Sequence, residues 1–301
     1  MAEGSLPDSG LSRTRSTKTR ELMRVLTPAK INTLLHILRR RDDGYHELFS
    51  HFVPVDIFDM LEVEKQSEGG ILFDLKGCKQ NQPKHNNLVL TAAAVFEKAL
   101  GEPLNLKISL TKNIPPGSGL GGGSGNAGGM LVILNRLHNQ PFPLKKLKLL
   151  AVGIGADVPF FVDPRPSEIR STGCVTKYLN GYPLLPLLVV KPPFSISTSE
   201  AYRECIPLEL NSKPHIRNEE DLIKNLYNHF EESLFPKFPE LQELKTLLIE
   251  YGALGASVSG SGSSVFGIFG SKAEQLEAAR MLQQNKKFEV FPCMMLEKHS
   301  Y

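Results

Sequence analysis

A glycine-rich run at residues 115–125, Pro-Pro-Gly-Ser-Gly-Leu-Gly-Gly-Gly-Ser-Gly, contains the residue types that bind phosphate groups. Alternating apolar residues predict a strand over 104–110 before it, and helical spacing predicts a helix over 127–137 after it. Glycine amides can approach an anion closely, and a helix N-terminus adds free N–H groups and a partial positive charge. Ser118 and Ser124 add hydroxyl donors. The run therefore predicts a cradle for a di- or triphosphate, with a flexible hinge as the alternative.

Two common nucleotide motifs do not account for this run. The P-loop motif ends in Gly-Lys-Ser or Gly-Lys-Thr, and here no lysine closes the glycines. Gly117, Gly119 and Gly122 satisfy the dinucleotide fingerprint, but residues 137–148 lack the acidic residue that would hold a ribose. The His-Arg-Asp and Asp-Phe-Gly motifs of protein kinases are also absent from the sequence. These three classes of nucleotide enzyme are therefore excluded.

Asp157 and Lys30 are the residues whose types suit transfer of a phosphoryl group to an alcohol. Such a transfer needs positioned charges and a base that takes the hydroxyl proton. Asp157 follows a predicted helix and precedes Pro159 on a stiff turn, so it is a candidate base or an ordinary turn aspartate. Lys30 lies between apolar residues of a predicted strand, so it is a partner for Asp157 or a lysine that reaches solvent. Asn32 shares its strand face and is a candidate for binding substrate hydroxyls.

Composition limits the class of protein. The 301 residues are 41% hydrophobic and 22% charged, as in an ordinary globular protein of about two domains, and the net charge of +3 is too small to indicate nucleic-acid binding. No run approaches the ~20 apolar residues that span a bilayer. The four cysteines are scattered like reduced thiols, without the pattern of a disulfide framework or zinc site. We therefore expect a cytoplasmic protein without nucleic-acid or membrane partners, and a homodimer is left open.

Helices and strands are mixed in both halves, which favours an α+β fold over one doubly wound sheet. We expect a disordered tail at 1–23, an N-terminal ATP-binding domain at 24–168 and a C-terminal domain at 169–301. Besides the elements around the glycine run, the expected strands are 25–32, 51–63, 184–191 and 288–294, with a strand–turn–strand unit over 256–269. The expected helices are 87–100, 144–152, 219–231, 239–251 and 273–284.

Three segments resemble, in chain order, the motifs of the GHMP kinases, a family that includes galactokinase, homoserine kinase, mevalonate kinase and phosphomevalonate kinase. The first is Pro-Ala-Lys-Ile-Asn at 28–32, the second is the glycine run, and the third is Ser-Gly-Ser-Gly-Ser at 259–263. The resemblance implies a two-domain GHMP kinase fold with the active site in the cleft between the domains. It also implies ATP and Mg²⁺ as cofactors.

Two further segments narrow the resemblance. Arg-Asp-Asp-Gly-Tyr-His at 41–46 and Gly-Ala-Asp-Val-Pro-Phe-Phe at 155–161 are similar to the 4-diphosphocytidyl-2-C-methyl-D-erythritol kinases. That similarity implies phosphorylation of the 2-hydroxyl of a cytidine diphosphate-linked small molecule in the non-mevalonate isoprenoid pathway. A mevalonate-type or homoserine kinase, or a non-catalytic nucleotide-binding protein on the same fold, remains an alternative.

The resemblance also implies roles for individual residues. Asp157 is the expected general base, assisted by Lys30. Tyr45 and His46 are expected to meet the cytidine, with Tyr202 stacking on its opposite face and Thr198 donating or accepting a hydrogen bond. No residue is assigned as a metal ligand. The expected nucleotide contacts are Lys112, for which an exposed strand-end lysine is the alternative, and Pro115, Pro116, Gly117, Ser118, Gly119, Leu120, Gly121, Gly122, Gly123, Ser124 and Gly125. Gly125 departs from the family, which commonly has a serine there.

Overall fold

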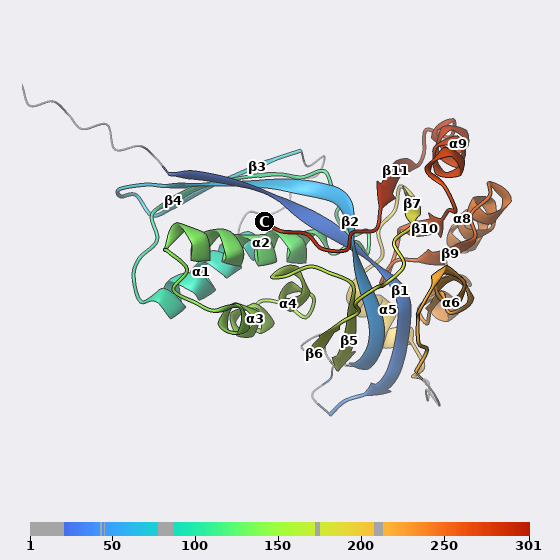
Figure 1. Cartoon of the computed structure of the whole chain (residues 1–301), viewed down its shortest axis with the longest axis horizontal. Helices are drawn as coiled ribbons and strands as arrows, with labels where there is room; N and C mark the ends of the chain where they lie inside the picture. Colours follow the sequence, from blue (N-terminus) through green and yellow to red (C-terminus); the bar gives the residue numbers. More distant parts are fainter. Residues whose placement is uncertain (1–20, 43, 45, 78–86, 172–174, 208–212) are drawn as a thin grey trace, which may run out of the picture.

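The computed structural model describes residues 21–42, 44, 46–77, 87–171, 175–207 and 213–301, arranged around two sheets (Figure 1). The first sheet has the order β3-β4-β2-β1-β8, with β5 paired to β2 and β6 to β5. Its strands are β1 (Leu22–Arg40), β2 (His46–Lys65), β3 (Ile71–Lys76), β4 (Leu106–Thr111), β5 (Ser167–Ser171), β6 (Val175–Tyr178) and β8 (Tyr227–Asn228). The second sheet has the order β11-β7-β10-β9, made by β7 (Pro186–Lys191), β9 (Gly255–Val258), β10 (Val265–Ile268) and β11 (Glu289–Met294).

Helices pack on one side of each sheet. The side of the first sheet that faces down in Figure 1 is covered by α1 (Leu88–Leu100), α2 (Gly122–Leu137), α3 (Leu144–Val152) and α4 (Val158–Phe161). The second sheet packs against α8 (Pro239–Glu250) and α9 (Lys272–Gln283). Three short helices complete the described chain: α5 (Thr198–Glu204), α6 (Glu219–Lys224) and α7 (Glu231–Leu234).

Two long antiparallel strands, β1 and β2, connect the two halves of the molecule. They contain 19 and 20 residues, and their pairing shifts register between Pro28 and Ala29 and again between Asn32 and Leu34. A register shift of this kind bends a strand and re-aims its side chains. The two shifts flank Lys30, so the irregular part of β1 is the part that carries the first motif.

A shared apolar core joins the sheets where β1 and β2 pass the second sheet. Ala29 and Ile31 of β1 are fully buried in it, together with Val53, Val55, Leu187, Val189, Phe266 and Ile268. Side chains alternate between the two faces of a strand. The intervening residues of β1, Lys30 and Asn32, therefore project from the opposite face.

The structure corrects the predicted domain and tail boundaries. Residues 1–20 lie outside the described part of the chain, but Leu22 already belongs to β1, so the strand begins inside the predicted tail of residues 1–23. The boundary predicted between 168 and 169 falls within β5. Because β5 pairs with β2 and β6 pairs with β5, the first sheet continues to Tyr178, and sheet membership changes between β6 and β7.

Two predicted helices also differ. The helix predicted at 219–231 is divided into α6 and α7 by β8, because the Asn228 amide donates to the carbonyls of Val258 and Gly260 and β8 pairs with β1. The helix predicted at 127–137 begins earlier, at Gly122, so the last residues of the glycine run form its first turn. No described helix is long and apolar enough to cross a membrane.

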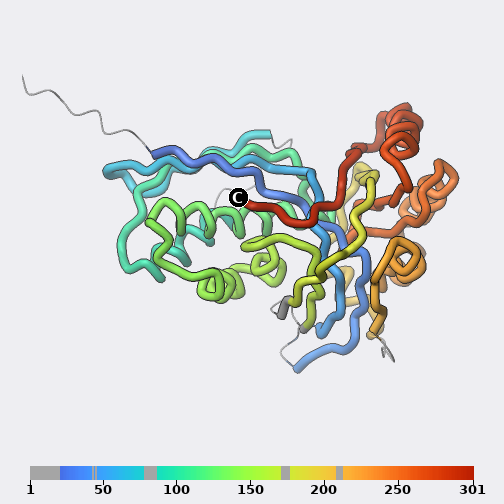
Figure 2. Tube along the Cα trace, viewed as in Figure 1, coloured from blue at the N-terminus to red at the C-terminus, as the bar shows by residue number. Residues whose placement is uncertain are grey.

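The C-terminal segment returns from the second sheet to the helices of the first. After β11, the Leu296 amide donates to the Pro54 carbonyl, and the chain then runs beside α2, as Figure 2 shows in red. Tyr301 donates its hydroxyl to the Phe161 carbonyl at 2.5 Å, at the end of α4. The segment thus links the C-terminal part of the sequence to the short helix that follows Asp157.

Candidate active site

The glycine run lines a cavity of about 550 Å³. Gly117, Gly119 and Gly121 have φ angles of 63°, 77° and 72°, a region that favours glycine. At Gly119 the chain also passes so close to the turn after β9 that a Cβ atom would lie 2.0 Å from the Ser259 carbonyl oxygen. The loop therefore needs glycine there for both its backbone angle and its packing.

The predicted third motif holds the glycine run in place. The Ser264 amide donates to the Ser118 carbonyl at 3.1 Å, and the Ser259 hydroxyl donates to the Gly119 carbonyl at 3.1 Å. Gly260 and Ser261 line the same cavity. The second and third motifs, far apart in the sequence, therefore form one wall.

The N-terminus of α2 opens into this cavity. Gly121 occupies the N-cap position in the left-handed conformation; no described side chain caps the helix, and its first turn contains no acidic residue. Gly122, Gly123 and Ser124, the first three helical residues, line the cavity. The uncapped N–H groups of a helix attract anions. This end of the cavity therefore suits phosphate groups.

Lys30 is buried at the floor of the cavity, with a side chain that is 4% exposed. Its ammonium donates to the Asn32 side-chain oxygen at 2.6 Å and to the Gly119 carbonyl at 2.9 Å. Asn32 in turn donates to the Ser50 hydroxyl at 2.9 Å. Burial lowers the pKa of Lys30, and the nearby carboxylate of Asp157 partly offsets this by raising it. The first motif thus fixes a cation directly beneath the glycine run.

Asp157 lies across from this cation, with its Oδ2 3.9 Å from Lys30 Nζ. It precedes α4 but makes no capping hydrogen bond with its side chain, which is 33% exposed. A carboxylate that faces a cavity without a capping bond can accept a proton from a bound hydroxyl. The predicted pairing of Lys30 with Asp157 is present as an ion pair.

A second cavity of about 810 Å³ meets the first at Asp157. Both cavities are lined by Leu48, Phe52, Ala156, Asp157, Thr198 and Tyr202. The second one continues to His46, whose ring stacks on Tyr202 with centroids 5.2 Å apart, and to Arg40 and Arg203. Burial and the charge of Arg40 lower the pKa of His46, which favours its neutral ring. Asp157 is therefore placed between a phosphate-binding end and a second, partly aromatic chamber.

Comparison with known proteins decides the family. Residues 87–163 match the model for the GHMP kinases N terminal domain, and residues 213–287 match the GHMP kinases C terminal model. A 4-diphosphocytidyl-2-C-methyl-D-erythritol kinase of Porphyromonas gingivalis is 39% identical over 267 residues, 85% of this chain and 96% of that protein. The chain belongs to the GHMP kinase family. It is an ATP-dependent small-molecule kinase.

Three further proteins agree with this placement. A 4-diphosphocytidyl-2-C-methyl-D-erythritol kinase of Syntrophus aciditrophicus is 36% identical over 278 residues, 90% of this chain and 98% of that protein. The crystal structure of a 4-(cytidine 5'-diphospho)-2C-methyl-D-erythritol kinase has 34% identity and a TM-score of 0.78, covering 91% of this chain and 100% of that one. A homoserine kinase from Cytophaga hutchinsonii, at 19% identity and a TM-score of 0.75, shares the fold. The predicted GHMP kinase fold is confirmed.

Most of the predicted site residues line one of the two cavities. Tyr45 lies outside the described residues. Leu120 and Gly125 do not line either cavity. Leu120 is buried, and its carbonyl accepts the Lys30 amide, so it supports β1. Gly125 faces Pro28, whose carbonyl oxygen would lie 2.8 Å from a Cβ at this position. Leu120 and Gly125 therefore pack the glycine run against β1 and do not face the cavity.

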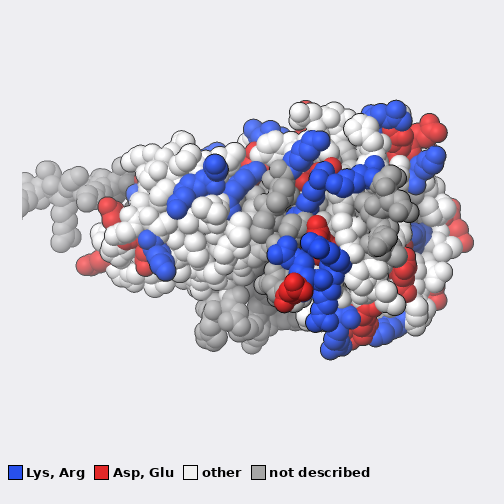
Figure 3. Space-filling view, turned by 90° about the horizontal axis from the view of Figure 1, so that it is seen from below, with Lys and Arg blue, Asp and Glu red and all other residues white. Residues whose placement is uncertain are grey.

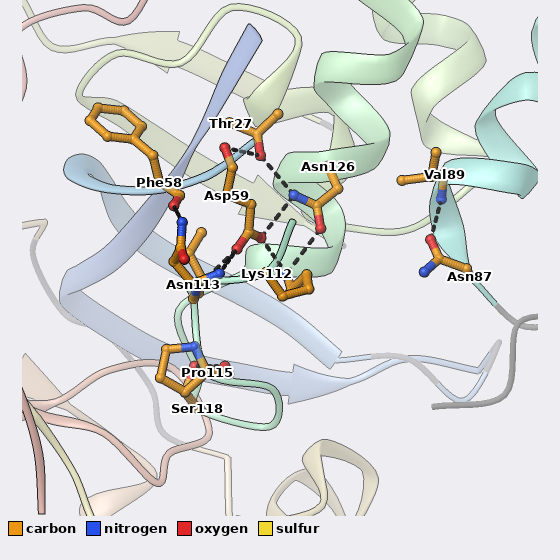
Figure 4. Close-up of polar contacts among 11 residues, drawn as sticks. Thr27, Phe58, Asp59, Asn87, Val89, Lys112, Asn113, Pro115, Ser118 and Asn126 are labelled. Atoms are coloured by element: carbon orange, nitrogen blue, oxygen red, sulfur yellow. Dashed lines mark hydrogen bonds and ion pairs between the residues drawn. The ribbon is translucent and has the colours of Figure 1, made fainter. Parts of the chain in front are cut away.

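Sequence reasoning missed several residues of the site. Asn87, Leu88 and Phe230 line the first cavity. Asn87 also caps α1, because its side-chain oxygen accepts the Val89 amide at 3.0 Å. Asp59 was also missed, although it holds Lys112 at the edge of the cavity (Figure 4). One signal for Asp59 is present in the sequence, because it is an acidic residue inside the strand predicted at 51–63. Burying a carboxylate is costly unless it has a partner.

Proposed function

We propose that this GHMP kinase transfers the γ-phosphoryl group of ATP to the 2-hydroxyl of 4-diphosphocytidyl-2-C-methyl-D-erythritol. The observation that carries the proposal is the meeting of two cavities at Asp157, one beside the uncapped end of α2 and the other beside the His46–Tyr202 ring pair. A kinase of this kind needs a phosphate site and an acceptor site that share a base. The relatives from P. gingivalis and S. aciditrophicus are named as kinases of this acceptor, which supports the proposal.

The phosphates of ATP are proposed to bind at the glycine run and at the N-terminus of α2. Backbone amides and the Ser124 hydroxyl supply donors there, and Lys112 at the cavity edge supplies a cation. In the described part of the chain, no group of three or more His, Cys, Asp or Glu side chains gathers as a metal site. Mg²⁺ commonly uses few protein ligands, and Ser124 and Asp157 are oxygen donors that line the cavity. Mg²⁺ carried by the nucleotide would neutralise phosphate charge.

Asp157 is proposed to act as the general base on the acceptor hydroxyl. As the hydroxyl oxygen forms its bond to the γ-phosphorus, the bond from that phosphorus to the β-bridging oxygen breaks and ADP leaves. The hydroxyl proton moves to the Asp157 carboxylate. Lys30 stabilises negative charge at this position, and Asn32 holds Lys30 in place with a 2.6 Å hydrogen bond.

The second cavity is proposed to bind the cytidine diphosphate portion of the acceptor. The stacked rings of His46 and Tyr202 offer flat surfaces for a base, and Thr198 offers a hydroxyl. Arg40 and Arg203 line this cavity and supply charge for a diphosphate. Lys and Arg side chains gather in the middle of the face seen in Figure 3. We include Tyr45 in this site as a prediction, on the grounds of the Asp-Gly-Tyr-His motif.

A substrate panel tests this proposal. The purified protein is incubated with ATP, Mg²⁺ and, in separate reactions, the diphosphocytidyl substrate, mevalonate or homoserine. We expect ADP release that depends on the diphosphocytidyl substrate and a product that carries one additional phosphate on its 2-oxygen by NMR. ADP release with mevalonate or homoserine instead would assign a different acceptor. ATP binding without turnover on any of the three would indicate a non-catalytic protein. Homodimer formation and a cytoplasmic location remain predictions.

A further inference from the structure

Asp59 of β2 is a fully buried carboxylate at the entrance to the glycine run. Its Oδ1 accepts the backbone amides of Asn113 and Ile114 at 2.7 and 2.8 Å. Its Oδ2 accepts the Asn126 side-chain amide at 2.9 Å and the ammonium of Lys112 (Figure 4). Four donors, from residues 112–114 and from Asn126 of α2, therefore converge on one side chain.

Lys112 is the cation of this cluster. Two of its three ammonium N–H groups point to Asp59 and to the Asn126 side-chain oxygen, the latter at 3.0 Å. Its Nζ lies 3.1 Å from where a Cβ of Gly122 would be, so it sits against the first residue of α2. Lys112 also lines the nucleotide cavity. One ammonium donor is therefore not used in the hydrogen bonds found among the described residues.

The location of this ammonium is electrostatically unfavourable without Asp59. The N-terminus of a helix carries a partial positive charge, which repels a cation placed beside it. A buried carboxylate cancels that repulsion and fixes the ammonium before any nucleotide arrives. Asn126 adds to the restraint, because its amide also donates to the Thr27 hydroxyl at 2.7 Å and so joins α2 to β1.

We infer that Asp59 is a positioning residue for nucleotide binding, which acts by holding Lys112 at the start of α2. When the cation is held beforehand, binding of the phosphates does not have to restrict a long flexible side chain. This inference rests on the ATP-binding half of the proposed function. It does not depend on which alcohol accepts the phosphoryl group.

Three variants test the inference: Asp59→Asn, Lys112→Met and the double variant. ATP binding is measured by titration without acceptor. KM for each substrate is measured while the other substrate is saturating, and kcat is taken with both saturating. We expect Asp59→Asn to weaken ATP binding about tenfold or more, with kcat and acceptor KM within about twofold. The double variant should bind ATP as Lys112→Met alone does, because Asp59 acts through Lys112.

A control separates this role from loss of stability. Gln275→Met removes two buried hydrogen bonds, to the carbonyls of Leu187 and Cys293, and Gln275 lines neither cavity. It should lower the melting temperature without changing KM for ATP. If Asp59→Asn does not fold, Asn126→Leu removes the other acceptor of Lys112 and should weaken ATP binding in the same direction. Unchanged ATP affinity in Asp59→Asn or Lys112→Met, or independent additive effects in the double variant, would overturn the inference.

Discussion

The ammonium of Lys30 lies 3.9 Å from Oδ2 of Asp157, yet its hydrogen bonds go elsewhere, to Asn32 at 2.6 Å and to the Gly119 carbonyl at 2.9 Å. The cation is therefore fixed by the strand and by the glycine run, and its position does not depend on Asp157. Asp157 therefore interacts electrostatically with the Lys30 ammonium at 3.9 Å, a distance longer than a hydrogen bond. This arrangement leaves Asp157 able to take a proton while its surroundings keep their geometry.

Removing the base should abolish turnover and preserve nucleotide binding. For Asp157→Asn we expect kcat to fall by about 10²- to 10⁴-fold, the usual contribution of general acid–base catalysis. The ATP-induced rise in melting temperature should persist, since the glycine run and α2 are unchanged. Thermal unfolding with and without ATP, alongside steady-state kinetics, checks both. Turnover within tenfold of the unchanged protein would contradict the assigned base.

Lys30→Arg should not restore the function of the lysine. A Cβ on Gly260 would lie 3.1 Å from Lys30 Nζ, and one on Gly121 would lie 3.1 Å from its Cγ, so a larger guanidinium has little room. We expect kcat to fall at least about 100-fold. The fall should match that of Lys30→Met within a few fold. Recovery of most activity in the arginine variant would show that only charge is needed.

The family's serine at position 125 should be destabilising here. A Cβ at Gly125 would lie 2.8 Å from the Pro28 carbonyl oxygen, so α2 must move away from β1. Overpacking of this kind costs about 1–3 kcal/mol, and we expect Gly125→Ser to lower the melting temperature by several degrees.

Gly123→Ala is the matched control for that stability measurement. It lies in the same helical turn, and its nearest neighbour would be Leu88 at 3.8 Å, an ordinary contact. Its melting temperature should stay the same or rise, because alanine favours a helix by up to about 1 kcal/mol over glycine. Equal stability of the two variants would contradict the close packing at Gly125.

Acid should destabilise the kinase through His51. The residue is 2% exposed, and its Nε2 has no hydrogen-bond partner among the described residues. Burial lowers the pKa of His51 to about 4; the nearby Glu168 opposes this, and His36 and His215 add to it. An unfolded histidine has a pKa near 6.5, so between pH 6.5 and 4 the unfolded chain binds more protons than the folded one. Stability should fall by about 2 kcal/mol between pH 7 and pH 5 from this residue.

Urea unfolding at pH 7 and pH 5 measures this dependence. His51→Asn should lower stability at pH 7 and flatten the change with pH, because the residue that titrates is gone. The same pH dependence in the variant as in the unchanged protein would assign the acid sensitivity to other groups, such as His36.

Loss of the aromatic surface in the second cavity should affect the acceptor and leave ATP unaffected. Tyr202 stacks on His46 and packs edge-on against Phe230, with centroids 5.2 and 4.8 Å apart. Stacking of a base on an aromatic ring is worth about 1–3 kcal/mol, so Tyr202→Ala should raise KM for the acceptor about 10- to 100-fold. Tyr202→Phe should stay close to the unchanged protein. An equal rise in KM for ATP would show that the cavity had collapsed.

The sequence was most informative where chemistry and local structure coincide. The glycine run, Lys30 and Asp157 could be found because each is a distinctive residue type beside a turn or strand end. The elements around them follow from periodicity and helix-terminating residues, as in the helix predicted at 87–100, which is observed as α1 between its caps Asn87 and Gly101. Within α2, Gly128 and Gly129 allow the close approach of Phe161 and Thr27.

Contacts between distant segments could not be predicted. The pairing of Lys112 with Asp59 depends on the register of β2 with β4, which the pattern of one strand does not specify. β8 interrupts the helical pattern of residues 219–231 because the Asn228 side chain donates hydrogen bonds to the carbonyls of Val258 and Gly260, at the end of β9 and in the turn after it. In both cases a polar side chain is satisfied by tertiary structure, which overrides local preference.

The hydrogen bond from Tyr301 to the Phe161 carbonyl has a consequence for synthesis on the ribosome. The helix after Asp157 is completed by a residue that is translated near the end of this sequence. Domains generally fold from the N-terminus while the chain is still emerging. Ser261 is the last residue in the sequence that lines the nucleotide cavity, so the walls of that cavity are translated before the residue that supports the helix beside the base. In the growing chain, the support for the helix after Asp157 should therefore form later than the contact between the glycine run and the third motif.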